Sequence, residues 1–426
     1  MRCLGVYQVE ASKALLKPKT WASRRLPVSR NVFLLGTVSL LTDVSAEMVA
    51  TVLPLYLVFS LGVTPLAVGA IDGLYRGAAA IVQVAGGFAS DRLGRHKEVA
   101  TLGYGISAVG KVALVVAGGT LGAIGAIVGG DRIGKGIRTA PRDALISLSS
   151  SKAGLATAFG VHRAMDSAGA MLGPLLAFGI LLAAPGRFDA VFVVSTAFAF
   201  LGLAVLVLAV NGRPRRTATA VESDGGGPRL SLRAGLGLVG ERRFRLLLLA
   251  AGGLALASVS DVMIYLGLQR QSGFEPAVFP LLFVVTALIF MVLAIPVGRL
   301  ADRVGRVPVL IAGHALLLPV YALLLTEIGF GGVLLALLAL GAYFAATDGV
   351  TTALAGAILP DRLQGTGIGM LITVISLAKL GSSLAFGALW FVLGLQSAVL
   401  VFGAALAAVL VCAALLLRGV QRERAA

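Results

Sequence analysis

The feature that most restricts the fold of this chain is a series of about a dozen long apolar stretches separated by short polar breaks. A helix that crosses a bilayer needs about 20 mostly apolar residues, and each stretch reaches that length. With 58% hydrophobic and only 13% charged residues, the chain lacks the polar surface of a water-soluble protein. The sequence therefore predicts an all-α membrane protein with twelve transmembrane helices, at residues 31–60, 65–89, 98–118, 120–141, 157–184, 188–210, 244–269, 276–297, 308–326, 330–359, 364–391 and 394–417.

Positive charge is concentrated on one side of this predicted topology. Lys and Arg outnumber Asp and Glu by 36 to 20, an excess that would also suit a nucleic-acid binder. The bases lie in both tails, in the central linker and in every second loop, whereas the remaining loops carry only Arg187 and Arg270. The positive-inside rule therefore predicts a multi-pass protein of the inner (plasma) membrane with both termini in the cytoplasm. Its surroundings are lipid, and nucleic acid is not expected as a partner.

The chain repeats itself once. Gly87-Phe-Ala-Ser-Asp91-Arg92-Leu-Gly94-Arg95 follows the second stretch, and Gly298-Arg-Leu-Ala-Asp302-Arg303-Val-Gly305-Arg306 follows the eighth. This repeat predicts two pseudo-symmetric six-helix bundles. The bundles are expected at residues 30–210 and 244–418, with a basic tail at 1–29, a Gly- and Pro-containing linker at 211–243 and a short tail at 419–426.

The two repeated loops resemble the signature of the major facilitator superfamily (MFS). The resemblance implies the MFS fold, a secondary transporter, and a gating role for these loops, with membrane topology as the alternative explanation of their charges. A monomer is expected because one chain already has both halves. The expected gating residues are Gly87, Asp91, Arg92, Gly94, Arg95, Gly298, Asp302, Arg303, Gly305 and Arg306. An aspartate there can cap a helix or pair with an arginine, and breaking that contact would shift the conformational equilibrium.

Two further motifs are similar to those of the same family. Arg132-Ile-Gly-Lys135-Gly136 resembles the motif of the fourth helix, except that Lys135 replaces the usual Gln. Gly169-x-x-x-Gly173-Pro174 resembles the antiporter motif of the fifth helix, although the glycine pair that normally follows is absent. Pro174 removes a backbone donor, so a bend in this helix is predicted, with passive packing as the alternative.

Charged residues inside the apolar stretches are the best guide to a functional site. Each costs about 2.5–3.5 kcal/mol at the bilayer centre, so these side chains are expected to face the interior of the protein. The acids are Asp43, Glu47, Asp72, Asp131, Asp166, Asp261 and Asp348, and the bases are Arg76, Lys111, Arg132, Lys135, Arg163 and Lys379. Most lie in the first half, where coupling is therefore expected.

Some of these charges are spaced for mutual neutralisation. Opposite charges three or four residues apart share a helix face. The candidate pairs are Asp72 with Arg76, Asp131 with Lys135, and Arg163 with Asp166, and Asp348 and Lys379 are expected to face each other between two helices. Such pairs serve either structure alone or contact with substrate.

Asp43 and Glu47 have no base nearby in the sequence. They lie four residues apart on one helix face, and like charges in a poorly hydrated place favour proton binding by one of them. We interpret them as candidates for proton coupling or substrate contact, with neutralisation by Arg132 or Arg163 as the alternative. Asp261 falls about one helical turn from the position equivalent to Glu47 in the second half, which makes it a candidate pseudo-symmetric partner.

The bases Lys111, Arg132, Lys135 and Arg163 gather in the first half. A basic cluster would attract an anionic group of a substrate, or else it only balances the acids. His162 precedes Asp166 by one turn, so it is either a proton relay or a structural histidine.

These features favour a secondary transporter that moves a small organic solute by coupling to protons, with export by antiport preferred over uptake by symport. A non-transporting receptor is the alternative from another class. An enzyme is not expected, because the three histidines (His96, His162, His314) are scattered and no nucleophile with a base is apparent. Neither a metal nor another cofactor is expected, and Cys3 and Cys412 lie on segments with no reason to meet.

Overall fold

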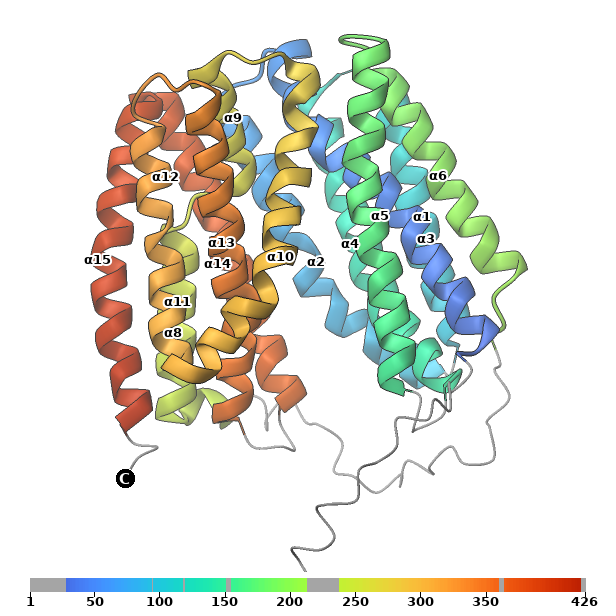
Figure 1. Cartoon of the computed structure of the whole chain (residues 1–426). Helices are drawn as coiled ribbons and strands as arrows, with labels where there is room; N and C mark the ends of the chain where they lie inside the picture. The colour runs from blue at the N-terminus through green and yellow to red at the C-terminus, as the bar shows by residue number, and fades with distance from the viewer. Residues whose placement is uncertain are drawn as a thin grey trace, which may run out of the picture.

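The computed structural model describes residues 28–93, 95–117, 119–150, 155–212, 237–359 and 364–422 (Figure 1). The first half contains α1 (Arg30–Leu55), continued by the π-helical turn η1 (Tyr56–Ser60), then α2 (Pro65–Leu93), α3 (His96–Val116), α4 (Leu121–Leu148), α5 (Leu155–Ala183) and α6 (Phe188–Leu208). The second half contains α8 (Arg242–Ala257), α9 (Asp261–Ser272), the short 3-10 turn η3 (Pro276–Val278), α10 (Phe279–Val304), α11 (Arg306–Ala315), α12 (Leu317–Leu323), α13 (Phe330–Ile358), α14 (Gln364–Leu393) and α15 (Leu395–Arg422).

These helices account for twelve spans. In the described part of the chain, ten helical segments are long and apolar enough to cross a membrane. α2 and α4 are equally long. α4 carries more charge, including Asp131 and Lys135, and many side chains of α2 lie outside the described residues. Both pack among the other helices, so their charges are shielded from lipid. The predicted all-α membrane fold of two six-helix bundles is therefore confirmed.

The two halves meet through two helix pairs. α2 packs along α14, and α5 packs against α10 (Figure 1). These pairs are equivalent under the repeat, because α2 and α10 are the second helices of their halves, and α5 and α14 are the fifth. Small residues make the first contact close: a Cβ atom at Gly69 would lie 2.4 Å from the backbone oxygen of Ser383, and one at Gly387 would lie 2.7 Å from that of Pro65.

The predicted seventh span is not one helix. A single helix was expected at 244–269, but the structure ends α8 at Ala257 and begins α9 at Asp261. Ser260 is the N-cap of α9, and its side chain accepts a hydrogen bond from the Met263 amide. The intervening backbone is buried but satisfied, since Val259 donates to the Tyr321 hydroxyl (2.8 Å) and Ser382 donates to the Ser258 carbonyl (2.6 Å). Non-helical backbone at membrane depth is tolerated only where such partners exist.

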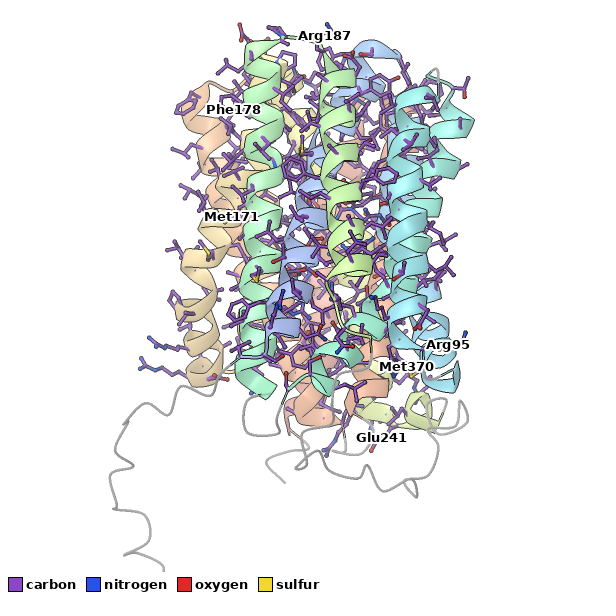
Figure 2. All side chains as sticks on the ribbon, turned by 90° about the vertical axis from the view of Figure 1, so that its right-hand side faces the viewer. Arg95, Met171, Phe178, Arg187, Glu241 and Met370 are labelled. Carbon is purple, nitrogen blue, oxygen red and sulfur yellow. The ribbon has the colours of Figure 1, made fainter. Side chains whose placement is uncertain are left out.

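The ends of the bundle differ in charge. Arg187 lies at one end, whereas Arg95 and Glu241 lie at the other (Figure 2). We call the second end the basic end, because Arg242, Arg243 and Arg303 also lie at helix termini there. The predicted tails and linker fall mainly outside the described residues, so their bounds stay predictions; within them, residues 237–240 are helical and α15 continues to Arg422.

Candidate functional site

A central cavity lies between the two halves and has two adjoining chambers. The first, of about 150 Å³, is lined mainly by α1, α2 and the start of α9 and includes Asp72, Tyr75 and Arg76. The second, of about 280 Å³, is lined by α1, α5, α9, α10 and α13 and includes Pro174, Phe290, Phe344 and Asp348. Glu47, Asp261 and Phe283 line both chambers. The structure thus brings the predicted pseudo-symmetric residues Glu47 and Asp261 to one cavity.

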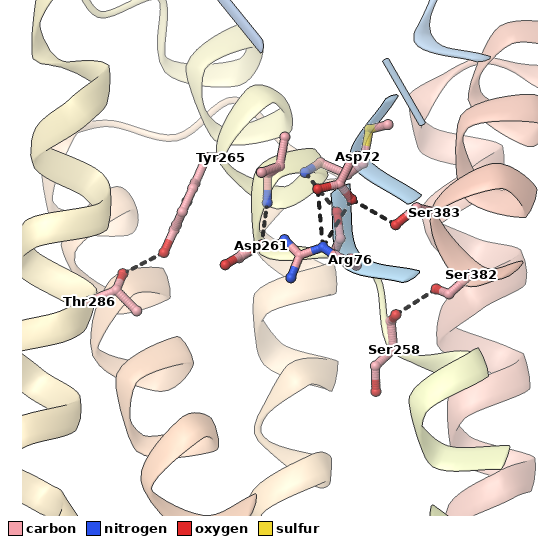
Figure 3. A network of polar contacts seen from close by, with 11 residues as sticks. Asp72, Arg76, Ser258, Asp261, Tyr265, Thr286, Ser382 and Ser383 are labelled. Atoms are coloured by element: carbon pink, nitrogen blue, oxygen red, sulfur yellow. Dashed lines mark hydrogen bonds and ion pairs between the residues drawn. The ribbon is translucent and has the colours of Figure 1, made fainter. Parts of the chain in front are cut away.

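An ionic network at the first chamber joins the halves (Figure 3). Arg76 Nε lies 3.1 Å from Asp72 Oδ1, which confirms the predicted pair on α2. The same guanidinium contacts Asp261 on α9, and Ser383 on α14 donates to Asp72 Oδ2 at 2.7 Å. Asp261 also accepts from the Val262 amide, because it begins α9 directly after the helix break. The broken helix therefore aims this carboxylate at Arg76.

Asp43 does not pair with Glu47, its predicted like-charged neighbour. Its carboxyl group instead lies beside that of Asp166 on α5, so the neighbouring acids come from two helices. Arg142 Nη1 lies 3.9 Å from Asp166, and Lys135 on α4 is an electrostatic neighbour of both Asp43 and Glu47. Lys135, which replaces the usual Gln of the motif, therefore faces the acids of α1.

Two predicted ion pairs are wrong. Asp131 does not pair with Lys135; it lies 3.5 Å from Lys111 Nζ and 2.5 Å from Arg132 Nη2. Asp166 does not pair with Arg163, which is exposed. The reason is that spacing places two residues on a shared face without deciding which neighbouring helix each side chain meets. Arg163 has the helical phase of Ala170 and Pro174, which line the cavity, whereas Asp166 faces α1 and α4.

The predicted basic cluster is divided by the structure. Lys111 and Arg132 are 6% and 2% exposed, enclosed with Asp131, and Arg132 stacks over the Tyr75 ring at 3.8 Å. Only Tyr75 of this group lines the cavity. His162 is also buried, and its Nε2 atom lies 2.8 Å from Ser39 Oγ, which Arg142 contacts at 3.3 Å. A structural role explains these contacts of His162.

Asp348 and Lys379 line a third cavity, of about 240 Å³, inside the second half. Other polar residues in its wall are His314, Tyr343, Thr347, Thr351, Thr352 and Ser376. Asp348 and Lys379 were expected to face each other. Both line this cavity, but they form no ion pair within the described residues. Asp348 also lines the second chamber, and it therefore separates that chamber from the third cavity.

The gating loops are described only in part. α2 runs to Leu93, so Gly87, Asp91 and Arg92 are helical, but their side chains and Gly94 lie outside the described part. Arg95 is exposed at the start of α3. In the second copy Arg306 lies 3.4 Å from Asp302 and donates to the Ala353 carbonyl of α13 at 2.8 Å, while Gly305 ends α10 with φ +104°. Arg303 is exposed, and Gly298 has open space beside it.

Gly169 and Gly173 set the distance between α5 and α1. A Cβ atom at Gly169 would lie 2.4 Å from the Leu40 carbonyl, and one at Gly173 would lie 2.8 Å from that of Val44. Both contacts involve backbone, so larger residues would push the helices apart. α5 runs unbroken through Pro174, which lines the second chamber, and the predicted bend stays a prediction.

Comparison with known proteins identifies the family. The family model described as Major Facilitator Superfamily matches residues 35–293 and 248–426. The chain belongs to the Major Facilitator Superfamily. Among curated MFS relatives, it is 39% identical over 176 residues to an "Uncharacterized MFS-type transporter" of Methanocaldococcus jannaschii, covering 41% of this chain and 44% of that protein. An "Uncharacterized protein" of Mycobacterium tuberculosis (strain H37Rv) is 36% identical over 152 residues, covering 36% of this chain and 37% of that protein. These matches span less than half of either relative.

Solved MFS structures share the fold at low identity. An inward-facing, unoccupied bacterial homologue of the human lysosomal transporter Spinster superposes with a TM-score of 0.73 at 15% identity, covering 94% of this chain and 99% of that one. A variant of the nucleoside transporter NupG gives 0.75 at 13% identity, covering 91% and 99%. A variant of the peptide transporter POT, in complex with sulfate, gives 0.73 at 16% identity, covering 92% and 94%. This MFS chain thus shares the fold of these multi-pass transporters.

Sequence reasoning missed the aromatic wall and the cross-half hydroxyl. Phe283, Phe290 and Phe344 line the second chamber, but nothing in an apolar stretch marks one phenylalanine as facing a cavity. Ser383, fully buried against Asp72, was also missed. The helix break had a signal: Ser260 followed by Asp261 is a typical N-cap sequence, here within an apolar stretch.

Proposed function

We propose that this MFS protein exports a small organic solute across the plasma membrane by alternating access, in exchange for protons. The basic end faces the cytoplasm, in keeping with the positive-inside rule. The protein acts as a monomer, because one chain supplies both halves of the cavity. Its partners are the solute, protons and the surrounding lipid.

The observation that carries proton coupling is the proximity of the carboxyl groups of Asp43 and Asp166 on two packed helices at membrane depth. Two carboxyl groups side by side in a poorly hydrated place favour one bound proton, because their negative charges repel each other. Asp43 lies one turn from Glu47, which lines both chambers, and Lys135 is an electrostatic neighbour of both acids. A change of protonation at Asp43 or Asp166 therefore alters the electrostatic environment of Lys135, and through it that of Glu47 in the cavity wall.

The packing of α5 on α1 supports a link between protonation and movement. Gly169 and Gly173 hold the two helices in backbone contact at the level of Asp43 and Glu47. Asp166 lies on the same helix as these glycines, so loss of the carboxyl contact would remove a polar contact between α1 and α5. The similarity of Gly169, Gly173 and Pro174 to the antiporter motif supports exchange over symport.

Proteoliposomes with a pH-sensitive dye in the lumen test this function. A panel of solutes is added outside, and an exported solute should make the lumen more alkaline as it enters. Asp43→Asn and Asp166→Asn should each remove at least nine tenths of this proton movement, because neither amide can bind or release the proton. Asp189→Asn, at an exposed site near Arg187, is the matched control and should retain it.

The outcomes separate the alternatives. Lumen acidification on solute addition would replace export by proton symport. Solute binding without flux of any panel member would indicate a receptor. Full pH-driven flux in both Asp43→Asn and Asp166→Asn would overturn the assignment of coupling to the carboxyl pair.

A further inference from the structure

The charges that line the central cavity are strongly unbalanced. Among the described residues, the two chambers are lined by four acids and one base, which are Glu47, Asp72, Asp261, Asp348 and Arg76. Arg76 is held between Asp72 and Asp261, so its positive charge is already matched. The second chamber has three acids, Glu47, Asp261 and Asp348, and no base in its described wall.

Glu47 and Asp348 form no ion pair within the part of the chain that the structure describes, and their electrostatic neighbours Lys135 and Lys379 line neither chamber. An ionised group at membrane depth is costly unless a partner or a water-filled cavity compensates it. Both carboxyl groups line the second chamber, so a ligand there is placed to supply the missing positive charge. This arrangement is built into the cavity wall rather than scattered over the surface.

The remaining wall of the second chamber is aromatic. Phe283, Phe290 and Phe344 line it together with Tyr265, whose ring meets that of Phe283 edge-on at 4.6 Å. Aromatic faces attract cations, with energies that reach about 2 kcal/mol when the cation is desolvated. The protein already uses such a contact nearby, where Arg132 stacks on Tyr75. An apolar cation would therefore gain from both the rings and the acids.

The bases predicted to attract an anion do not line either chamber. Lys111 and Arg132 are buried with Asp131, and neither Lys135 nor Arg163 belongs to the described wall of the chambers. An anion in the second chamber would meet the carboxylates of Glu47 and Asp348, which form no ion pair among the described residues, and no base in the described wall. We propose that the central cavity takes an amphipathic organic cation, its charge near Glu47 and Asp348 and its apolar body against Phe283, Phe290 and Phe344.

This substrate class rests on the proposed function for transport, but binding can be measured without it. The sharpest probes are tetraphenylphosphonium and tetraphenylborate, which have nearly the same size and shape and opposite charge. Radiolabelled probes are bound to the full-length protein in nanodiscs, and binding to empty nanodiscs is subtracted. Wild-type protein should bind the phosphonium at least tenfold more tightly than the borate.

Variants locate the site. Glu47→Gln and Asp348→Asn should each weaken phosphonium binding about tenfold, and Phe290→Ala should weaken it several-fold. Asp348→Glu keeps the charge and should restore most of the affinity. Asp189→Asn should bind like wild type. Thermal unfolding of each variant shows whether it is folded.

Equal or tighter binding of the borate by wild-type protein would overturn the proposal even if every variant failed to fold. So would unchanged phosphonium affinity in folded Glu47→Gln and Asp348→Asn. Phosphonium binding without flux would leave the cation site standing and overturn the transport function. Proton-coupled flux of another solute without phosphonium binding would leave the transport function standing and overturn the cation site.

Discussion

Arg76 on α2 forms an ion pair with Asp261 on α9, and this pair connects the two halves of the transporter. α9 lies towards the Arg187 end of the bundle (Figures 1 and 2). The close packing of α2 on α14 through Gly69 and Gly387 belongs to the same interface. The Arg187 end is therefore closed both by helix packing and by a specific ionic contact. In the proposed alternating-access cycle, this contact has to break when that end opens.

Replacing Arg76 by Gln should favour opening at the Arg187 end. It removes the contact between the halves and leaves Asp72 and Asp261 without the cation that separates their charges. Coupling energies of about 1–3 kcal/mol correspond to about 5–150-fold shifts in such an equilibrium. Leu53 lines the first chamber and is 4% exposed, so Leu53→Cys reports opening. In intact cells its labelling by a membrane-impermeant maleimide should rise about tenfold in Arg76→Gln.

The background for this assay replaces Cys3 and the exposed Cys412 by Ser. Arg187→Gln is the matched control, since it breaks an exposed pair with Asp189 (2.9 Å) on the same end without joining the halves. It should leave the labelling rate unchanged. If Leu53→Cys is labelled at the same rate with and without the Arg76→Gln substitution, the ion pair does not hold this end closed.

Larger residues at Gly169 or Gly173 should destabilise the first half. The added Cβ atom meets the backbone of α1 in both cases, and backbone cannot yield as a flexible side chain can. Overpacking of this kind costs about 1–3 kcal/mol. Gly169→Ala and Gly173→Ala should therefore lower the temperature at which the detergent-solubilised protein loses its monodisperse peak in size-exclusion chromatography.

Gly179→Ala is a control on the same helix, because no atom lies within 4 Å of the added Cβ. Its thermal stability should equal or slightly exceed that of wild type, since alanine favours helix more than glycine. Equal loss of stability at all three positions would mean that helix propensity, and not contact with α1, explains the effect.

Sequence reasoning predicted those parts of the fold that depend on local pattern. The length of each apolar stretch gave the spans, and the repeated loops gave the two bundles, because a helix satisfies its backbone within itself. The pair Asp72 and Arg76 was predictable for the same reason, as both residues lie on one face of one helix. Glu47 and Asp261 could be related only through the repeat.

Contacts between helices were beyond that reasoning. Asp43 meets Asp166, but these residues lie on helices that are far apart in the sequence. Asp131 meets Lys111 on the preceding helix, but the sequence does not give the rotation of one helix relative to the other. A single sequence gives the residues on each face of a helix, but it does not give which face of a neighbouring helix packs against them. The break at Ser258–Ser260 was missed although Ser260 and Asp261 form an N-cap sequence, because a break at membrane depth needs backbone partners, and these come from Tyr321 and Ser382 on other helices.

The buried contact between Asp131 and Lys111 gives a test of how the protein tolerates charge in its interior. Asp131→Asn should be strongly destabilising, because it leaves Lys111 and Arg132 buried without a counter-charge; breaking a buried ion pair typically costs about 3–5 kcal/mol. Lys111→Met should cost less, since Asp131 still pairs with Arg132. The double variant Lys111→Met with Asp131→Asn should be more stable than Asp131→Asn alone, because it buries one uncompensated charge fewer. Thermal unfolding of the four proteins forms a double-mutant cycle, and additive effects of the two substitutions would show that Lys111 and Asp131 do not stabilise each other.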